Sequence, residues 1–253
     1  MIDSKSLIYT EFKDPRNGKI TDFEEGSSGP LLLGRDKKSG KRYIIKHTYA
    51  HNAANEFVCC SLAEKLGIAA PRAYLLTPSE RFSSKYAVAI EFLDGMKEVN
   101  KDNLTAQMKK DICCAYAFQY AFAQSDLVAI REWNNRVVTF DFSEAFNMDD
   151  MGFLLMILEK APEAAPEFLG RYLSGFQNSI TTNLDYADVF EKDLNIDPDF
   201  THDAINGLWK QLVEIPDSDI YAICDELDLM YPVEIGLYYE AAIRAVIDYC
   251  LNT

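Results

Sequence analysis

The sequence lacks any apolar run long enough to cross a membrane. A membrane-spanning helix takes about 20 consecutive apolar residues, and no stretch of the 253-residue chain approaches that length. The first segment, MIDSKSLIYTEFKD, also lacks the apolar core of a secretory leader. We therefore expect a protein that neither spans a membrane nor enters the secretory pathway.

Histidine is scarce, and cysteine does not follow the spacing of a metal site. There are three histidines, and none pairs with another at metal-ligand spacing. The six cysteines include two adjacent pairs, Cys59-Cys60 and Cys113-Cys114, in segments with helical patterns. Adjacent cysteines on a helix favour buried thiols over a disulfide framework or a zinc site. These features predict a reduced, cytoplasmic protein without structural zinc.

Positive charge is also in short supply. The formal net charge of −15 argues against DNA or RNA as a partner, because nucleic-acid binding needs a basic surface. Residues 1–93 contain 14 lysines and arginines against 11 acidic residues, whereas residues 94–253 contain 11 against 29. This asymmetry predicts an N-terminal lobe, 1–93, with a net charge of +3 and a C-terminal lobe, 94–253, with −18.

What the sequence does contain, in residues 26–56, is a pattern suited to gripping phosphates. Gly26, Ser27, Ser28 and Gly29 form a turn between two predicted strands, and their small side chains let backbone N–H groups approach an anion. Lys46 lies in the strand predicted over 41–48, where the two-residue period places it on the same face as Ile44. Ordinary hairpin glycines and a solvated edge lysine are the alternative interpretation.

A helix is predicted over 53–66, with Asn52 as its N-cap and Gly67 after its end. Glu56 lies on a helical face that is otherwise small and apolar. A buried carboxylate there needs a cationic partner, since an unpaired buried charge costs several kcal/mol. Lys46 is the nearest candidate, unless Glu56 lies exposed at the rim.

Two further strands are predicted over 72–76 and 86–92. Glu91, Phe92 and Leu93 end the second strand where the acidic half begins. They can form a hinge whose backbone reads an adenine edge, although any strand that ends before an Asp-Gly turn has a similar pattern.

A long helix over 103–124 is followed by a hairpin within 125–146, with Asn134-Asn135 as its turn. Asp126 follows the helix, and Asp141 ends the second strand of the hairpin. Two carboxylates brought together in this way can hold magnesium and orient a hydroxyl. Taken singly, each is also typical of an ordinary loop aspartate.

The remainder of the chain is predicted to be helical. Pro162 and Pro166 are expected to break the helices around them, and Arg244 is expected to pair with a carboxylate. The predicted helices span 151–160, 167–177, 186–192, 202–213, 217–229 and 232–252.

The order of these motifs resembles that of the HipA-like kinases, a compact branch related to protein kinases and phosphoinositide kinases. The most specific part of the resemblance is the phrase NEF…LAEKLGIAAP followed much later by DFSEAF, and motifs extend over roughly residues 20–146. The resemblance implies an α+β fold with two lobes, a small β-rich one with one helix and a larger, mostly helical one. It also implies an ATP and Mg²⁺ site between them.

The resemblance also implies roles for individual residues. Lys46 would hold the α- and β-phosphates, and Glu56 would fix Lys46. Asp141 would bind magnesium, and Asp126 would be the base. The Gly26–Gly29 turn and the hinge of Glu91, Phe92 and Leu93 would complete the nucleotide site.

One position departs from the family pattern. An asparagine that acts as the second metal ligand is expected about five residues after the base, but Arg131 stands there. Losing such a ligand removes transition-state charge stabilisation. Three functions therefore stay open: a kinase that phosphorylates a protein serine or threonine or itself, a degenerate kinase that binds nucleotide or a partner, and a small-molecule kinase. The phosphoacceptor and the oligomeric state are not predicted.

Overall fold

The computed structural model describes residues 1–11, 31–123, 128–180, 186–232 and 234–252, without the side chains of residues 148 and 186–189. Gly26, Ser27, Ser28, Gly29 and Asp126 lie outside the described residues, so their predicted roles stay predictions. The strand expected before residue 31 lies outside them as well.

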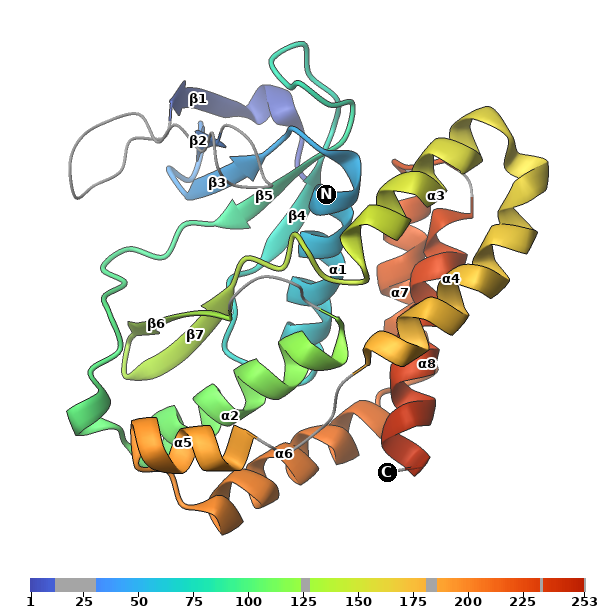
Figure 1. The fold of residues 1–253 in the computed structure, drawn as a ribbon. Helices are drawn as coiled ribbons and strands as arrows, with labels where there is room; N and C mark the ends of the chain where they lie inside the picture. Colours follow the sequence, from blue (N-terminus) through green and yellow to red (C-terminus); the bar gives the residue numbers. More distant parts are fainter. Residues whose placement is uncertain (12–30, 124–127, 181–185, 233, 253) are drawn as a thin grey trace.

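The N-terminal half is built on a five-stranded antiparallel sheet (Figure 1). The strands pair in the order β1-β2-β3-β5-β4, and a short 3-10 helix, η1 (Ser4–Ser6), precedes them. Successive side chains along a strand point to opposite faces of the sheet. In β3, Tyr43 and Ile45 therefore enter a small cluster of buried side chains on one face, while Ile44 packs against the main core on the other. Their bounds are β1 (Leu7–Glu11), β2 (Leu31–Asp36), β3 (Arg42–Lys46), β4 (Ala73–Leu76) and β5 (Ala87–Glu91).

Helix α1 (Ala50–Lys65) follows β3 and is buried on nearly every side. The sequence is rich in small residues there, and Ala53, Ala54 and Ala63 are fully buried. Small side chains let neighbouring elements approach the helix closely, and α1 packs against β4 and β5 as well as α3 and α7. It is therefore the central helix of the molecule rather than a surface helix of the sheet (Figure 1).

The predicted N-cap of this helix is wrong. The helix begins at Ala50, with Tyr49 at the N-cap position in an extended conformation and without a side-chain cap. Asn52 lies inside the first turn and is buried. The prediction chose the polar residue next to the apolar run, but tertiary packing continues the helix over the His51-Asn52 pair that precedes the run.

The C-terminal half begins with helix α2 (Ala106–Ala121) and the hairpin of β6 (Ala129–Trp133) and β7 (Arg136–Phe140). Thr105 caps α2 by accepting a hydrogen bond from the Met108 N–H at 3.2 Å. Asn134 and Asn135 have φ angles of 50° and 60°, the left-handed conformation that a tight two-residue hairpin turn requires. Their prediction as turn residues is confirmed.

The helices that follow match the predicted set within a few residues. A short 3-10 helix, η2 (Lys101–Asn103), precedes α2, and another, η3 (Pro162–Ala164), separates α3 from α4, as the prolines predict. Arg244 pairs with Asp217 at 2.5 Å, as expected. The bounds are α3 (Met148–Lys160), α4 (Ala165–Ser179), α5 (Tyr186–Leu194), α6 (Pro198–Val213), α7 (Asp217–Asp228) and α8 (Ile235–Asn252).

One large cluster of buried side chains joins the two halves. It includes Val88 and Ile90 from the sheet, most of α1, and the inward faces of α2, α6, α7 and α8. All six cysteines are free thiols; five are buried and Cys250 is half-buried. None of the helices in the described part of the chain combines the length and apolar character that a membrane span requires.

Candidate functional site

Lys46 ends β3 and is buried, with 7% of its surface exposed. It lies on the same face of the strand as Ile44, and both line a cavity between the sheet and the β6–β7 hairpin. The predicted sharing of a face is therefore confirmed. Because β3 pairs with both β2 and β5, the backbone that carries this lysine is fixed on both sides.

Glu56 lies on the buried face of α1 and contacts the Lys46 ammonium. This is the pairing that the sequence predicts, and the exposed alternative is wrong because Glu56 has no exposed surface. Burial raises the pKa of Glu56, and the Lys46 charge opposes that rise.

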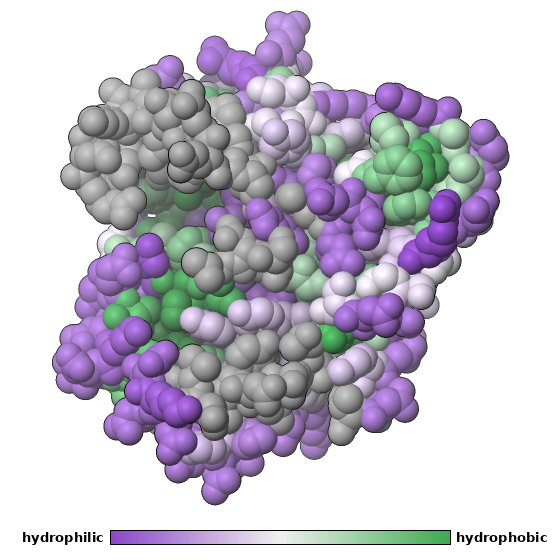
Figure 2. Space-filling view, in the orientation of Figure 1, coloured by the Kyte–Doolittle hydropathy of each residue, from purple (hydrophilic) through white to green (hydrophobic). Residues whose placement is uncertain are grey.

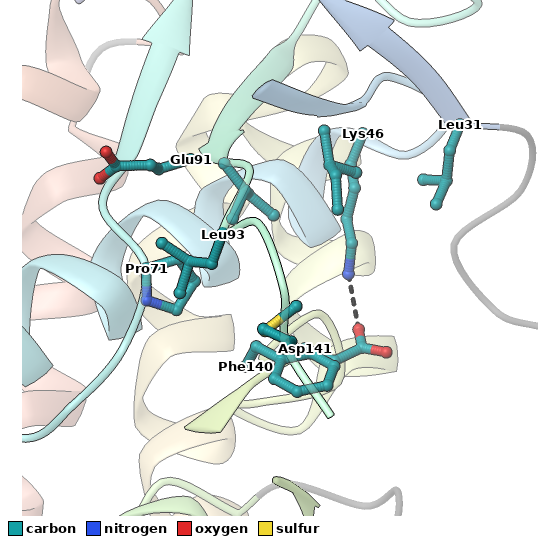
Figure 3. A pocket seen from close by; sticks show the side chains of 10 residues that line it. Leu31, Lys46, Pro71, Glu91, Leu93, Phe140 and Asp141 are labelled. Carbon is teal, nitrogen blue, oxygen red and sulfur yellow. Dashed lines mark hydrogen bonds and ion pairs between the residues drawn. The ribbon is translucent and has the colours of Figure 1, made fainter. Parts of the chain in front are cut away.

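Asp141 follows directly on β7 and reaches Lys46 from the opposite half. Its Oδ1 atom lies 2.5 Å from the Lys46 Nζ atom (Figure 3), and it accepts a hydrogen bond from the Ser143 hydroxyl at 3.0 Å. The Asp141 backbone has a φ of 65°, which turns the chain sharply at the end of the strand. The Lys46 charge holds the pKa of Asp141 below its ordinary value, against the effect of burial.

The Lys46 ammonium therefore lies between two carboxylates. Burial alone would lower the pKa of Lys46, but Glu56 and Asp141 together hold it above the ordinary value. With both carboxylates ionised, the three groups have a formal charge of −1. Asp141 differs from Glu56 in being 43% exposed at its side chain, so it is the carboxylate that an incoming cation can reach.

A mostly apolar cavity of about 200 Å³ adjoins this cluster. Figure 2 shows apolar surface in the hollow between the sheet and the hairpin, and Figure 3 shows Lys46 and Asp141 facing each other at one end of the cavity. A site with apolar walls and a few charged groups at one end suits a ligand with a flat apolar part and a charged part. The lining residues are Leu31, Ile44, Lys46, Pro71, Ile90, Glu91, Leu93, Met96, Phe140 and Asp141.

Two of the three predicted hinge residues line this cavity. Glu91 and Leu93 line the cavity, although the Glu91 carboxylate points away from Lys46 (Figure 3) and pairs with Lys41 at 2.8 Å. The Phe92 ring lies against the Arg42 guanidinium, with the ring centroid 4.6 Å from its central carbon. Phe92 is absent from the lining of this cavity and lines a second hollow, which Glu91 and Leu93 also line.

The position of the expected asparagine is occupied by a residue with other partners. Arg131 lies in β6, donates to the Ile130 carbonyl at 2.8 Å and pairs with Glu98 at 3.2 Å. Neither contact brings it to Lys46 or Asp141.

Sequence reasoning missed the role of Asn55, which precedes Glu56 on α1. Asn55 is fully buried. Its amide donates to the carbonyls of Ser143 at 2.9 Å and Ala145 at 2.8 Å, and its Oδ1 atom accepts from the Tyr239 hydroxyl at 2.6 Å. The available signal was an asparagine that, together with Glu56, interrupts a stretch of small and apolar residues, which is unfavourable unless its amide is satisfied.

The donors around Asp141 suit a hard divalent cation. Mg²⁺ prefers oxygen ligands and commonly takes only one or two carboxylates from the protein, with the other positions filled by water and phosphate. Asp141 offers a half-open carboxylate beside the Ser143 hydroxyl. Within the described residues, no group of three or more histidine, cysteine or acidic side chains forms an all-protein metal site.

Together, the antiparallel sheet, the central helix and the helical half with its hairpin form a two-lobed, kinase-like fold. The solved structure of Helicobacter pylori proinflammatory kinase CtkA is similar to this chain, with a TM-score of 0.53 over 96% of each chain and 13% sequence identity. Identity this low supports the fold alone. No family model matches the sequence, and no curated protein matches it.

Proposed function

We propose that the chain is an ATP-dependent phosphotransferase that acts on a serine or threonine of a protein, or on itself. The observation that carries the proposal is the position of the Lys46 ammonium, held between Glu56 and Asp141 at the end of an apolar cavity. Lysine paired to a helix carboxylate, and facing an aspartate from the other lobe, is the arrangement that kinases use to hold phosphates and metal.

The proposal gives each residue of the site a separate role. The apolar walls of the cavity take the adenine ring, and Lys46 takes the α- and β-phosphates. Glu56 keeps the Lys46 side chain extended across the site and keeps its charge paired. Asp141 holds Mg²⁺, which supplies neutralisation of the phosphate charge when bound. Asp126 as base and the turn at Gly26–Gly29 as a phosphate loop stay predictions.

The charge of the site argues for a metal with the nucleotide. Glu56 and Asp141 outnumber the Lys46 ammonium, so a bare triphosphate approaching Asp141 meets a like charge. A divalent cation between the phosphates and Asp141 removes this repulsion. Tight ATP binding is therefore expected to require Mg²⁺ or a similar ion.

Thermal unfolding with and without Mg·ATP, together with transfer of labelled γ-phosphate, tests the proposal. Mg·ATP at 100 times its dissociation constant stabilises a protein by about 2.7 kcal/mol, so the parent melting temperature is expected to rise by several degrees. Lys46→Ala is expected to lose most of this rise, and Asp141→Ala is expected to lose phosphate transfer.

Lys65→Ala is the matched control, because Lys65 also pairs with a carboxylate, Asp219 at 2.6 Å, but on the surface and away from the cavity. It should respond to Mg·ATP as the parent does. A parent that shows no nucleotide-dependent stabilisation, or a Lys46→Ala variant that keeps it, would refute the assignment of the site. Label found only in small molecules would identify a small-molecule kinase instead.

A second candidate, a nucleotide-binding module without turnover, is favoured by one observation. Arg131 occupies the sequence position where the second metal ligand is expected, and its guanidinium donates to the Ile130 carbonyl and pairs with Glu98. Stabilisation by Mg·ATP without any phosphate transfer would select this candidate.

A further inference from the structure

The segment after Asp141 is held by one buried side chain of α1. Asn55 donates both of its amide hydrogens to this segment, one to the Ser143 carbonyl and one to the Ala145 carbonyl. Ser143 in turn donates its hydroxyl to the Asp141 carboxylate. Asn55 thus connects to the Asp141 carboxylate through Ser143: Asn55 holds the Ser143 backbone, and the Ser143 hydroxyl donates to Asp141.

The orientation of the Asn55 amide is settled by its partners. Only the NH₂ group has two hydrogens to give, and both neighbouring carbonyls can only accept. The carbonyl oxygen of the amide faces the Tyr239 hydroxyl, which donates to it at 2.6 Å from α8. Tyr239 is fully buried and its ring packs edge-on against Phe146, with the centroids 5.1 Å apart. The amide therefore has one arrangement that satisfies every partner.

Adjacent residues of α1 serve the two halves of the site. Glu56 contacts Lys46 in the sheet and also interacts with Asp141 and the Phe142 backbone, while Asn55 holds the carbonyls of Ser143 and Ala145 farther along the same segment. Both side chains are fully buried. One turn of α1 therefore holds both the Lys46 ammonium and the segment that carries the Asp141 carboxylate.

We infer that Asn55, locked by the Tyr239 hydroxyl, is a positioning residue that fixes the 141–146 segment and thereby places Asp141 for metal binding opposite Lys46. This inference rests on the proposed function for its consequence in metal binding. The positional part concerns the protein without any ligand and can be tested separately.

Tyr239→Phe is the most informative variant, because it keeps the ring that packs on Phe146 and removes only the hydroxyl. Tyr231→Phe is its matched control. The Tyr231 hydroxyl is also buried and also donates to α1, but to the Ala50 carbonyl at the start of the helix, at 2.8 Å. A general loss of stability would affect both variants, whereas loss of positioning would affect only the first.

The first measurement is hydrogen exchange of the backbone amides of Ala145 and Phe146 in the full chain without ligand. These amides donate to the carbonyls of Phe142 and Phe122, at 3.1 and 2.7 Å. In Tyr239→Phe their exchange is expected to accelerate about tenfold, which corresponds to the loss of one hydrogen bond. In Tyr231→Phe it should change no more than exchange in the rest of the core.

The second measurement is the ATP dissociation constant in EDTA and in excess Mg²⁺. Loss of a side chain that orients a metal ligand typically costs tenfold or more in metal affinity. In the parent, Mg²⁺ is expected to lower the ATP dissociation constant. In Tyr239→Phe the factor by which Mg²⁺ lowers it should be about tenfold smaller, with the dissociation constant in EDTA unchanged. Asn55→Asp should act in the same direction, because a carboxylate can accept from Tyr239 but cannot donate to the two carbonyls.

The two measurements separate the possible failures. Equal effects of Tyr239→Phe and Tyr231→Phe, or no effect of Tyr239→Phe on either measurement, would overturn the inference. A parent that binds no ATP would refute the proposed function, and the exchange measurement would still decide whether Asn55 and Tyr239 position the segment.

Discussion

Glu56 and Asp141 both contact the Lys46 ammonium, yet their surroundings move their pKa values in opposite directions. Glu56 is wholly buried, and the cost of desolvating its charge outweighs the attraction of Lys46. Asp141 is partly exposed at its side chain, and there the attraction of Lys46 outweighs desolvation. The two carboxylates therefore contribute to stability with opposite dependence on pH.

Asp141→Asn tests the contribution of the exposed carboxylate. Because the pKa of Asp141 is lower in the folded chain than its ordinary value of 3.8, its ionised form stabilises the fold above that pH, and the stabilisation is lost as pH falls through the folded pKa. The variant is expected to be less stable at pH 7 by up to about 1 kcal/mol, since solvent screens a half-open pair. Urea unfolding from about pH 7 to about pH 3 should show this difference shrink below about pH 4. A difference that stays constant over the whole range would contradict the ion pair.

The residues of this cluster differ in how far sequence could predict them. Lys46 and Glu56 are close in the chain, and strand alternation plus the cost of a buried carboxylate was enough to pair them. Asp141 required the resemblance to a family, because its partner is 95 residues away. The Asn55–Tyr239 bond joins residues 184 apart, and no local pattern indicates which tyrosine meets which asparagine.

The elements were predicted more completely than their ends. Each strand described from β2 onward and each helix from α1 onward was expected near its observed place, because apolar periodicity, prolines and turn residues mark them. Ends depend on tertiary contacts, as α1 shows by beginning at Ala50. The sequence of α1 did not predict that this helix would be buried on nearly every side, because its small residues produce little amphipathic pattern.

The junction of α7 and α8 gives a test of packing between elements. In the first turn of α8, a Cβ atom on Gly236 would lie 2.5 Å from the Cys224 carbonyl oxygen in α7, which is closer than atoms can approach. Gly236→Ala is therefore expected to destabilise the fold by about 1–3 kcal/mol through overpacking, measured by urea unfolding.

Gly207→Ala in α6 is the matched control for this substitution. A Cβ there has no neighbour within 4 Å, so the usual preference of helices for alanine should stabilise the protein by about 0.5–1 kcal/mol. The two glycine-to-alanine substitutions would then change the free energy of unfolding in opposite directions. Stabilisation by both substitutions would mean that α7 and α8 lie farther apart than described.

Across the molecule, negative charge is concentrated in residues 94–253. The net charge there is −18, against +3 in residues 1–93. The boundary of the lobes near residue 93 stays a prediction from this asymmetry, while the largest cluster of buried side chains draws on both sides of it. Under the proposed function, this concentration of negative charge acts on the approach of charged substrates.

A basic peptide substrate is therefore expected to be favoured over an uncharged one of equal length. Its advantage in kcat/KM should reach tenfold or more at low salt, and most of it should disappear as ionic strength rises from about 0.01 M to about 0.15 M, where the Debye length falls from about 30 to about 8 Å. Phosphate transfer to the two peptides at both ionic strengths checks this. Equal transfer to both peptides at low salt would exclude steering by the acidic lobe.

The placement of Asn55 beside Glu56 also bears on how the arrangement of Lys46, Glu56 and Asp141 can be lost. A rotation or slide of α1 would withdraw both neighbours together, one from the lysine and the other from the loop behind the aspartate. The Lys46–Glu56 contact and the hold on the segment after Asp141 would then be lost together.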